Sequence, residues 1–163
     1  MRYQFEVNCL HNARYSERQL HGGESDMFTG KCECGLVKYR VAGDLVEYSH
    51  CHCSICRRLH GAAFVTWGGV SRAEFSYTSG EGNMRAYAFS EKADSLFCNN
   101  CGSRMLVDFK PEADRLYIAM GTIDGDVQCP PGFHLFVGSK APWFEITDDL
   151  PQHDAWPDGE QDA

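Results

Sequence analysis

Seven of the nine cysteines in this 163-residue chain fall into three close groups, and closely spaced thiols are typical of metal sites. The groups are Cys32-Glu33-Cys34, Cys51-His52-Cys53-Ser54-Ile55-Cys56 and Cys98-Asn99-Asn100-Cys101. Cys9 and Cys129 stand alone, and we interpret them as ordinary thiols. An odd number of cysteines fits a disulfide framework poorly, so we expect metal-binding thiols in a reducing, cytoplasmic compartment.

A structural zinc site needs four thiolates in a tetrahedron, and the first and third cysteine groups offer two each. Each of these pairs is followed directly by a glycine, Gly35 or Gly102, which frees the backbone to approach the metal. We therefore favour a structural zinc held by Cys32, Cys34, Cys98 and Cys101. One alternative is that the third group shares a metal with the middle group and leaves the first group without one. Another is that no group binds metal.

The middle group then forms a set of three possible ligands, Cys51, Cys53 and Cys56. Three protein ligands and one open position are the arrangement of a catalytic zinc. A thiol that entered the open position would lose its proton and become a thiolate, ready to add to an aldehyde carbon. Arg57 and Arg58 follow the last cysteine. One of them could offset the negative charge of the site or bind a carboxylate of a peptide-like thiol; the alternative is that both are solvated helix charges.

The elements that must position these cysteines are predicted to be short strands. Runs rich in Val, Tyr, Phe and Thr, punctuated by Gly or Pro, predict strands within residues 36–43, 62–70, 73–80, 84–90, 103–109, 115–121 and 133–139. Only residues 54–61 are typical of a short helical turn. Because long crossover helices are absent, we expect a mainly β fold with antiparallel pairing.

Three ordered motifs carry a resemblance to a known family. The segments Gly30–Tyr39, His50–Ala62 and Phe97–Ser103 resemble the glutathione-dependent formaldehyde-activating (GFA) family, also called the centromere-protein-V/GFA domain. His134–Trp143 is similar to that family's C-terminal signature, so the resemblance runs from about Met27 to Pro151. It implies the Mss4-like fold, in which antiparallel β-sheets surround a structural zinc.

The same resemblance implies two zinc ions per chain and an activity. The structural zinc would be held by Cys32, Cys34, Cys98 and Cys101, and the second zinc by Cys51, Cys53 and Cys56. The implied activity is that of a carbon–sulfur lyase that condenses glutathione with formaldehyde to S-(hydroxymethyl)glutathione.

Four histidines are candidates for roles near these sites. His134 matches a position of the family signature and is our candidate for a general acid or base, or for a group just outside the metal ligands. His50 and His60 are interpreted as proton shuttles or as structural residues. His52 lies between two ligands, so alternation directs it away from the metal, toward the ligands' surroundings or the surface. We favour core positions over a substrate platform for the nearby aromatic residues, which are Phe64, Trp67 and Trp143.

Composition limits the partners and the domain organisation. The net charge is −8 without a basic stripe, which argues against a nucleic-acid partner, and the sequence has no apolar stretch long enough for a membrane helix or a secretory signal. We divide the chain into an N-terminal extension (1–26), a zinc domain (27–151) and an acidic, solvated tail (152–163).

Two hypotheses about function remain open. The first is a zinc enzyme that acts on a small thiol and an aldehyde. A homodimer is one assembly open to such an enzyme. The second is a zinc-stabilised module that binds proteins without catalysis, since the fold alone does not determine function. The three-cysteine group favours the enzyme, because a scaffold needs only the four-cysteine site.

Overall fold

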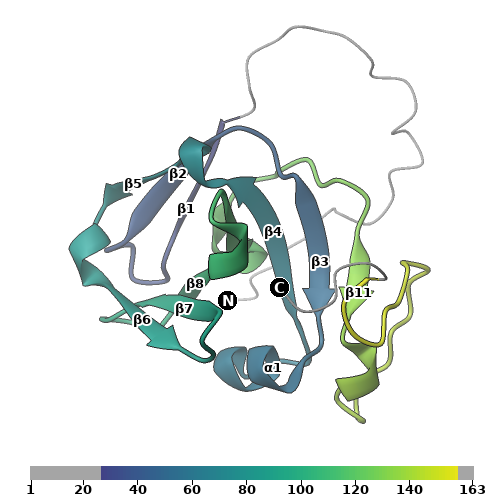
Figure 1. Ribbon diagram of the computed structural model, residues 1–163. Helices are drawn as coiled ribbons and strands as arrows, with labels where there is room; N and C mark the ends of the chain where they lie inside the picture. Colours follow the sequence, from purple (N-terminus) through teal and green to yellow (C-terminus); the bar gives the residue numbers. More distant parts are fainter. Residues whose placement is uncertain (1–26, 158–163) are drawn as a thin grey trace, which may run out of the picture.

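The computed structural model describes residues 27–157, which form a mainly β fold with one short α-helix (Figure 1). The predictions for residues 1–26 and 158–163 lie outside this part of the chain. The strands are β1 (Met27–Lys31), β2 (Lys38–Ala42), β3 (Glu47–Cys51), β4 (Val65–Ser71), β5 (Phe75–Ser79), β6 (Met84–Ala88), β7 (Ala93–Cys98), β8 (Arg104–Phe109), β9 (Arg115–Ala119), β10 (Ile123–Asp124) and β11 (Phe133–Leu135).

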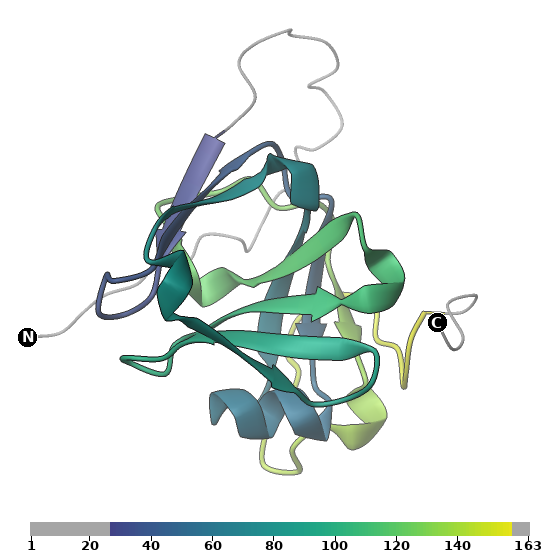
Figure 2. The ribbon, with the colours of Figure 1, turned by 60° about the vertical axis from the view of Figure 1, so that its left-hand side comes forward.

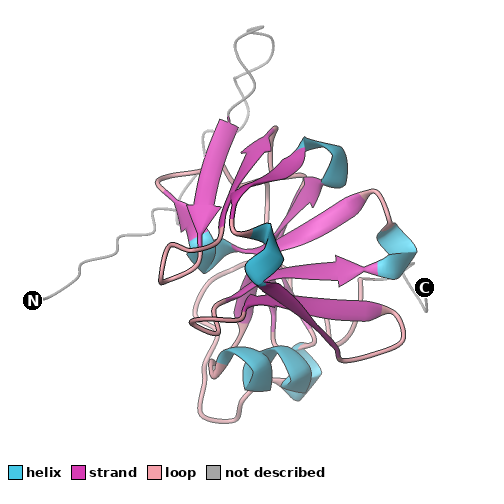
Figure 3. Ribbon diagram, turned by 90° about the vertical axis from the view of Figure 1, so that its left-hand side faces the viewer, coloured by secondary structure: helices cyan, strands magenta, loops and turns pink. Residues whose placement is uncertain are grey.

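The helical elements are short. The α-helix is α1 (Ser54–His60), and the single-turn 3₁₀ helices are η1 (Arg72–Glu74), η2 (Glu81–Asn83), η3 (Lys110–Glu112), η4 (Met120–Thr122) and η5 (Val137–Ser139). Strands dominate the secondary structure (Figure 3), so the predicted mainly β class is confirmed. No helix in residues 27–157 is long and apolar enough to cross a membrane.

Two β-sheets position the cysteines. The smaller sheet has the strand order β10-β1-β2-β5, and the larger sheet has the order β11-β3-β4-β9-β8-β7-β6. Eight of the nine strand pairs are antiparallel, as predicted; the exception is β11, which runs parallel to β3. Helix α1 lies at the end of the molecule opposite to β1 (Figure 2).

The core follows from the alternation of side chains along the strands. In β1 and β2 every second residue is buried, including Phe28, Tyr39 and Val41. These side chains pack with buried residues of the larger sheet, such as Met105 and Ile118, so one apolar cluster joins the two sheets. The larger sheet has a second, smaller buried cluster beside Cys51, and this cluster leads to the candidate site.

Each of the seven predicted strand segments contains a strand, and the predicted helical turn is α1. The prediction missed β1, β3, β7 and β10. Two of them end in metal-motif cysteines, Cys51 in β3 and Cys98 in β7, and we had interpreted these segments only as ligand motifs. Pairing with long-range partners, rather than local propensity, makes them strands.

Two expectations about side chains were wrong. Trp143 is 72% exposed and does not belong to the core. The segment that follows Pro151 is not a solvated tail over its first residues, because Gln152 pairs with His134 and the Trp156 ring packs on Phe136 with centroids 5.2 Å apart. Backbone hydrogen bonds to β11 hold this segment in place, which local acidity did not reveal.

Candidate metal centres and cleft

The four-cysteine cluster forms where the turns of two hairpins meet. Its members are Cys32, Cys34, Cys98 and Cys101, and their sulfur atoms all lie within 4.8 Å of one another. The Sγ atoms of Cys32 and Cys34 are 3.4 Å apart, and those of Cys34 and Cys98 are 3.9 Å apart. The first pair follows β1 and the second ends β7, so the cluster joins the smaller sheet to the larger one.

Two glycines shape the turns of this cluster. Gly35 has φ 71° and Gly102 has φ 76°, a left-handed conformation that favours glycine. Their amides donate to the carbonyl groups of Cys32 and Cys98, each at 2.9 Å, and so fold each turn around its cysteines. The glycines that follow the cysteine pairs in the sequence are therefore needed for turn geometry.

The thiol pKa values of this cluster differ between its buried and its exposed cysteines. Burial raises the pKa of Cys32 to about 11, whereas a hydrogen bond from Ser103 lowers the pKa of the exposed Cys101 to about 6. A buried thiolate needs a cation to offset its charge. Four sulfurs this close fit a tetrahedral zinc site, in the grouping that the sequence favoured and not in the alternative one.

The three-cysteine cluster is built locally, at the junction of β3 and α1. Cys51 ends β3, Cys53 is the N-cap of α1 and Cys56 lies in its first turn, with all three sulfurs within 4.8 Å. The Cys53 sulfur accepts a hydrogen bond from the Cys56 amide at 3.3 Å, as an N-cap side chain does. The start of the helix therefore fixes the distance between two of the sulfurs.

The thiols of this cluster differ in pKa, and Cys53 is the one that loses its proton most readily. Hydrogen bonds from Cys51 and Cys56 lower the pKa of Cys53 to about 2. Hydrogen bonding to Cys53 and Cys56, together with burial, raises the pKa of Cys51. Three thiolates can coexist here only beside a cation, so the donor set fits a zinc ion with three protein ligands.

A cleft of about 400 Å³ opens beside the three-cysteine cluster, on one face of the larger sheet. Alternation along β3 places Glu47, Ser49 and Cys51 on this face. The remaining lining is mostly apolar and aromatic: Cys53, Ile55, Cys56, Trp67, Phe89, Ser90, Lys92, Ala93, Val107, Phe109, Tyr117, Leu135, Phe136 and Trp156. We call this space the cysteine cleft.

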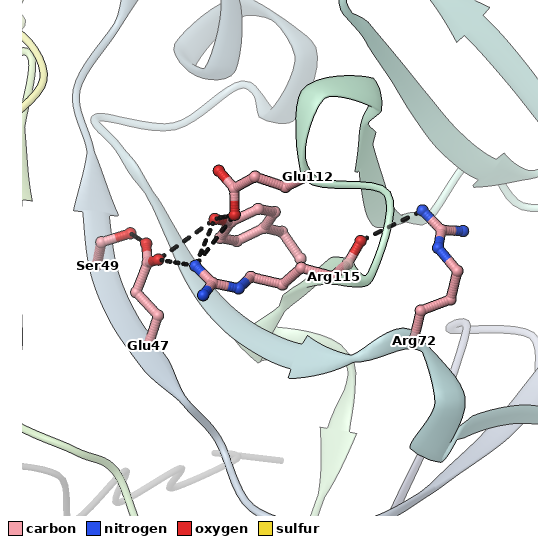
Figure 4. Close-up of polar contacts among 6 residues, drawn as sticks. Glu47, Ser49, Arg72, Glu112 and Arg115 are labelled. Carbon is pink, nitrogen blue, oxygen red and sulfur yellow. Dashed lines mark hydrogen bonds and ion pairs between the residues drawn. The ribbon is translucent and has the colours of Figure 1, made fainter. Parts of the chain in front are cut away.

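At the end of the cleft away from the cysteines, the side chain of Glu47 is held by hydrogen bonds (Figure 4). Arg115 Nη1 donates to Glu47 Oε2 at 3.2 Å and lies 3.0 Å from Glu112 Oε2. Tyr117 Oη donates to Glu112 at 2.8 Å and lies 3.3 Å from Glu47, and Arg72 donates to the backbone carbonyl of Arg115. Hydrogen bonds from Arg115 and Tyr117 thus fix the position of the Glu47 side chain.

Three of the histidines, His50, His52 and His134, lie on the side of β3 that faces away from the cleft. His134 is paired with His50 across the parallel β11–β3 register, while Leu135 is paired with Cys51 and faces the cleft. His134 Nδ1 lies 2.8 Å from His52 Nε2, and His134 Nε2 lies 3.0 Å from a carboxylate oxygen of Asp148. Both His134 nitrogens are therefore engaged away from the cleft.

This geometry favours one of the two roles expected of each of two histidines, a place just outside the metal ligands. His134 does not line the cysteine cleft in the described part of the chain, so it is not placed to act directly as a general acid or base on a molecule bound there. His52 is fully buried rather than at the surface, and it contacts His134 behind the cysteines. We interpret both as residues that fix the position of β3, and with it Cys51.

The two arginines after Cys56 also lie outside the cysteine cleft, as far as residues 27–157 define it. Arg57 donates from Nε to the His52 carbonyl at 3.2 Å and from Nη2 to the Ser139 carbonyl at 3.0 Å. It thereby ties α1 to the segment after β11. Arg58 is exposed on the helix.

A family model described as "Glutathione-dependent formaldehyde-activating enzyme" matches residues 27–139, which include both cysteine clusters. The chain belongs to this family. The recognition made from the motifs is therefore confirmed.

Similar proteins agree with this membership. A presumed glutathione-dependent formaldehyde-activating enzyme of Halomonas elongata is 28% identical over 128 residues, which are 74% of this chain and 81% of the relative. An uncharacterized lyase of Schizosaccharomyces pombe is 27% identical over 78 residues, or 48% of this chain and 55% of that protein. A crystal structure of a Rhodobacter sphaeroides protein shares the fold at 24% identity and TM-score 0.51, covering 60% of this chain and 88% of that one.

For this member of the GFA family, reasoning from the sequence missed much of the cleft. Glu47, Tyr117, Phe136 and Trp156 were not singled out, although period-two alternation in Glu47–Cys51 places Glu47 on the same face as Cys51. Phe136 has φ 57°, an unusual left-handed conformation for an aromatic residue that turns its ring onto Trp156. No local signal predicts that contact, because Trp156 lies in a segment typical of a polar tail.

Proposed function

We propose that this GFA-family chain is a zinc-dependent carbon–sulfur lyase that joins a small thiol such as glutathione to an aldehyde such as formaldehyde. The observation that carries the proposal is the position of the three-cysteine cluster, which lies in the wall of the cysteine cleft. A binding module stabilised by zinc would need only the four-cysteine cluster. A second cluster in a cleft wall favours chemistry on a bound molecule.

The two donor sets in the described residues support a proposal of two zinc ions per chain. Cys32, Cys34, Cys98 and Cys101 would hold a structural zinc with four thiolates, and Cys51, Cys53 and Cys56 would hold a catalytic one with three. When bound at the second site, zinc would supply a fourth position where a thiol is stabilised as a thiolate.

The chain's own residues hold the reacting groups in place. Cys53 and Cys56 are fixed by the start of α1, and Cys51 is fixed by the pairing of β3 with β4 and β11. The contacts among His52, His134 and Asp148 brace the back of β3, which is a positioning role for His134. The mostly apolar walls of the cleft offer a bound thiolate few polar partners.

The reaction balances without an oxidant or reductant. The sulfur–hydrogen bond of the thiol breaks, a bond forms between sulfur and the aldehyde carbon, and the carbonyl double bond becomes a single bond to oxygen. The proton that left the thiol returns to that oxygen, which gives a hemithioacetal. The reverse direction releases the thiol and the aldehyde.

The proposal is tested by metal-site spectroscopy together with exchange kinetics. Glutathione should add a sulfur-to-metal charge-transfer band to the spectrum of the Co²⁺-substituted protein. Exchange of formaldehyde with glutathione, followed by NMR exchange spectroscopy, should be faster with the parent protein than with Cys53→Ser at equal concentration. Equal rates for the two proteins together with an unchanged cobalt spectrum would overturn the proposal.

Two further predictions from the sequence accompany this proposal. A cytoplasmic location would be tested by cell fractionation with an antibody to the chain. A homodimer would be tested by light scattering during size-exclusion chromatography, where a mass of 18.3 kDa would indicate a monomer and twice that mass a dimer.

A further inference from the structure

The charged side chains that line the cysteine cleft lie on opposite sides of it. Among the lining residues in the described chain, Glu47 is the single acidic residue and Lys92 the single basic one. Glu47 lies in β3, whereas Lys92 directly precedes β7, and the strands β4, β9 and β8 lie between β3 and β7 in the larger sheet. A molecule in the cleft therefore meets a carboxyl group on one side and an ammonium group on the other.

The ammonium group of Lys92 differs from that of its neighbour Lys110 in what it contacts. Lys110 Nζ donates to the Glu91 carbonyl at 3.1 Å and lies 3.7 Å from a carboxylate oxygen of Asp94. Across residues 27–157, no hydrogen-bond or ion-pair partner contacts the Lys92 ammonium, although Lys92 lines the cleft and Lys110 does not. Lys92 is thus available to an anionic group of a bound molecule.

The segment that carries Lys92 offers a second hydrogen-bond donor. Residues 89–92 connect β6 to β7, and Ser90 also lines the cleft. The Lys92 amide donates to Ser90 Oγ at 3.2 Å, and the Lys92 carbonyl accepts from the Lys110 amide at 2.8 Å. A hydroxyl that accepts a hydrogen bond keeps its own O–H to donate. Ser90 and Lys92 together therefore present a hydroxyl and an ammonium at one place, which suits a carboxylate.

The thiol of the proposed function, glutathione, has two ends of different charge. Its γ-glutamyl end carries an ammonium and a carboxylate, whose charges cancel, whereas its glycine end carries a carboxylate alone. Six bonds separate the sulfur from the carbon of that glycine carboxylate. Because Glu47 repels an anionic group and Lys92 attracts one, the two ends are not equivalent in this cleft.

The cleft connects Lys92 with the cysteines over a distance that such a molecule can bridge. Phe136 packs on the smaller buried cluster beside the cysteines, and its ring contacts Trp156 with centroids 5.2 Å apart. The Trp156 ring in turn lies 6.0 Å from that of Phe109, which pairs with Ala93, the residue after Lys92. A lysine side chain and an arm of six bonds extend over roughly 6 Å and 8 Å. Together they match a span of two ring contacts and one strand pair.

We propose that Lys92 and Ser90 bind the glycine carboxylate of glutathione, so that the cleft selects thiols with an anionic arm of about this length. The inference rests on the proposed function, which places the thiol sulfur at the three-cysteine cluster. The γ-glutamyl end then lies toward Glu47. Lys92 acts on the affinity for the thiol and takes no part in forming the carbon–sulfur bond.

Two closely related probes test the carboxylate contact. Glutathione and its glycine ethyl ester differ at that carboxylate alone, which the ester leaves uncharged. Titrations of the Co²⁺-substituted protein, followed by the sulfur-to-metal charge-transfer band, should give a Kd at least fivefold lower for glutathione than for the ester. Since Lys92 is exposed, roughly 1 M salt should narrow this ratio. Equal Kd values for the two probes, or a ratio that salt does not change, would overturn the inference.

Substitutions at the two neighbouring lysines locate the contact. Lys92→Gln should bring the ratio of the two Kd values to about one, and Lys92→Arg, which keeps the charge, should retain most of it. Lys110→Gln is the matched control, because Lys110 is hydrogen-bonded to Lys92 through the backbone but lies outside the cleft lining, and it should keep the parent ratio. Circular dichroism of each variant would confirm that it is folded. A Lys92→Gln protein that still prefers glutathione fivefold would overturn the inference.

A third probe and the exchange kinetics separate this inference from the proposed function. Cysteine has its carboxylate only three bonds from the sulfur, so its Kd should be the same for the parent and Lys92→Gln; a Kd that depends on Lys92 would contradict the arm length. A charge-transfer band with equal Kd values for glutathione and its ester overturns this inference alone. If none of the three thiols produces a band and formaldehyde exchange is no faster with the parent than with Cys53→Ser, the proposed function fails and this inference fails with it.

Discussion

The four-cysteine cluster and the three-cysteine cluster present the same ligand atoms, but they constrain the chain differently. The first joins residues that are 64 positions apart, such as Cys34 and Cys98, and it connects the turns of two sheets. The second draws on six consecutive positions at the junction of β3 and α1. A metal at the first site closes a long loop, whereas a metal at the second closes a very short one.

Their surroundings differ as well. Of the four-cysteine cluster, Cys34 and Cys101 are exposed and none of the members lines the cysteine cleft in the described residues. The three members of the other cluster all line the cleft. Long-range closure without a cleft is suited to holding the fold, and local closure beside a cleft is suited to chemistry. The following predictions test this division, from the largest expected effect to the smallest.

Removing one sulfur from each cluster should have opposite consequences for folding. Cys98→Ser or Cys32→Ser should leave the chain unfolded or insoluble, because a structural zinc contributes about 10–16 kcal/mol of apparent binding free energy, more than most domains have to spare. Cys53→Ser should stay folded and bind one zinc instead of two. Thermal denaturation with metal analysis measures both, and a Cys32→Ser protein as stable as the parent would contradict the division.

A metal chelator should remove metal from the two cysteine clusters at different rates. A zinc ion held by the three-cysteine cluster would keep an open position toward the cleft, so we expect it to be removed at least tenfold faster than one held by the four-cysteine cluster, by analogy with open and closed zinc sites. Activity should be lost during this first phase, while circular dichroism changes only in the second. Simultaneous loss of both signals would show that the centres are not separable.

The wall formed by Trp156 should stabilise the fold by a measurable amount. Trp156→Ala should lower the free energy of unfolding by about 1–2 kcal/mol, less than for a fully buried aromatic residue because its side chain is 41% exposed. Trp143→Ala, at 72% exposure, is the matched control and should change it by about 0.5 kcal/mol or less. Equal effects in urea denaturation would mean that residues 152–157 do not pack as described.

The carboxylate behind β3 should contribute somewhat less. Asp148 accepts hydrogen bonds from the Leu150 amide and lies 3.0 Å from His134 Nε2. Asp148→Asn retains the shape but loses the charge, so it should reduce the free energy of unfolding by about 1 kcal/mol. Asp149→Asn, at the exposed neighbouring position, provides the comparison and should have no measurable effect.

A half-buried histidine in α1, His60, should make a small contribution to stability that depends on pH. Burial lowers the pKa of His60 from 6.5 to about 4, and its ring packs on Trp67 with centroids 5.4 Å apart. Since the unfolded chain binds the proton more tightly, stability is fully present above pH 6.5 and is lost as the pH falls toward 4.

The substitution His60→Gln should therefore reduce the loss of stability on acidification from pH 7 to pH 5.5. We expect a difference of about 0.5 kcal/mol once solvent screening is allowed for. Denaturation of the zinc-loaded parent and variant at both pH values measures it. A parent that loses no more stability than the variant would show that the pKa of His60 is not lowered in the folded chain.

The sequence by itself determined the local features of this protein. Runs rich in Val, Tyr, Phe and Thr predicted seven of the strands, and Gly35 and Gly102, each directly after a cysteine pair, marked the two turns where the φ angle is positive. The spacing of Cys51, Cys53 and Cys56 predicted a set of three ligands, because residues so close in the chain can meet at one helix start. These features depend on neighbours in sequence, and local conformational preferences are sufficient to specify them.

Tertiary structure decided which distant residues share a face. The parallel pairing of β11 with β3 turned His134 away from the cleft and Leu135 into it, and no propensity reports such a register. Packing of Trp156 on Phe136 gave the cleft a wall from a segment whose composition is typical of a tail. Contacts of this kind depend on the burial of surfaces contributed by separate elements, and only the folded chain brings those surfaces together.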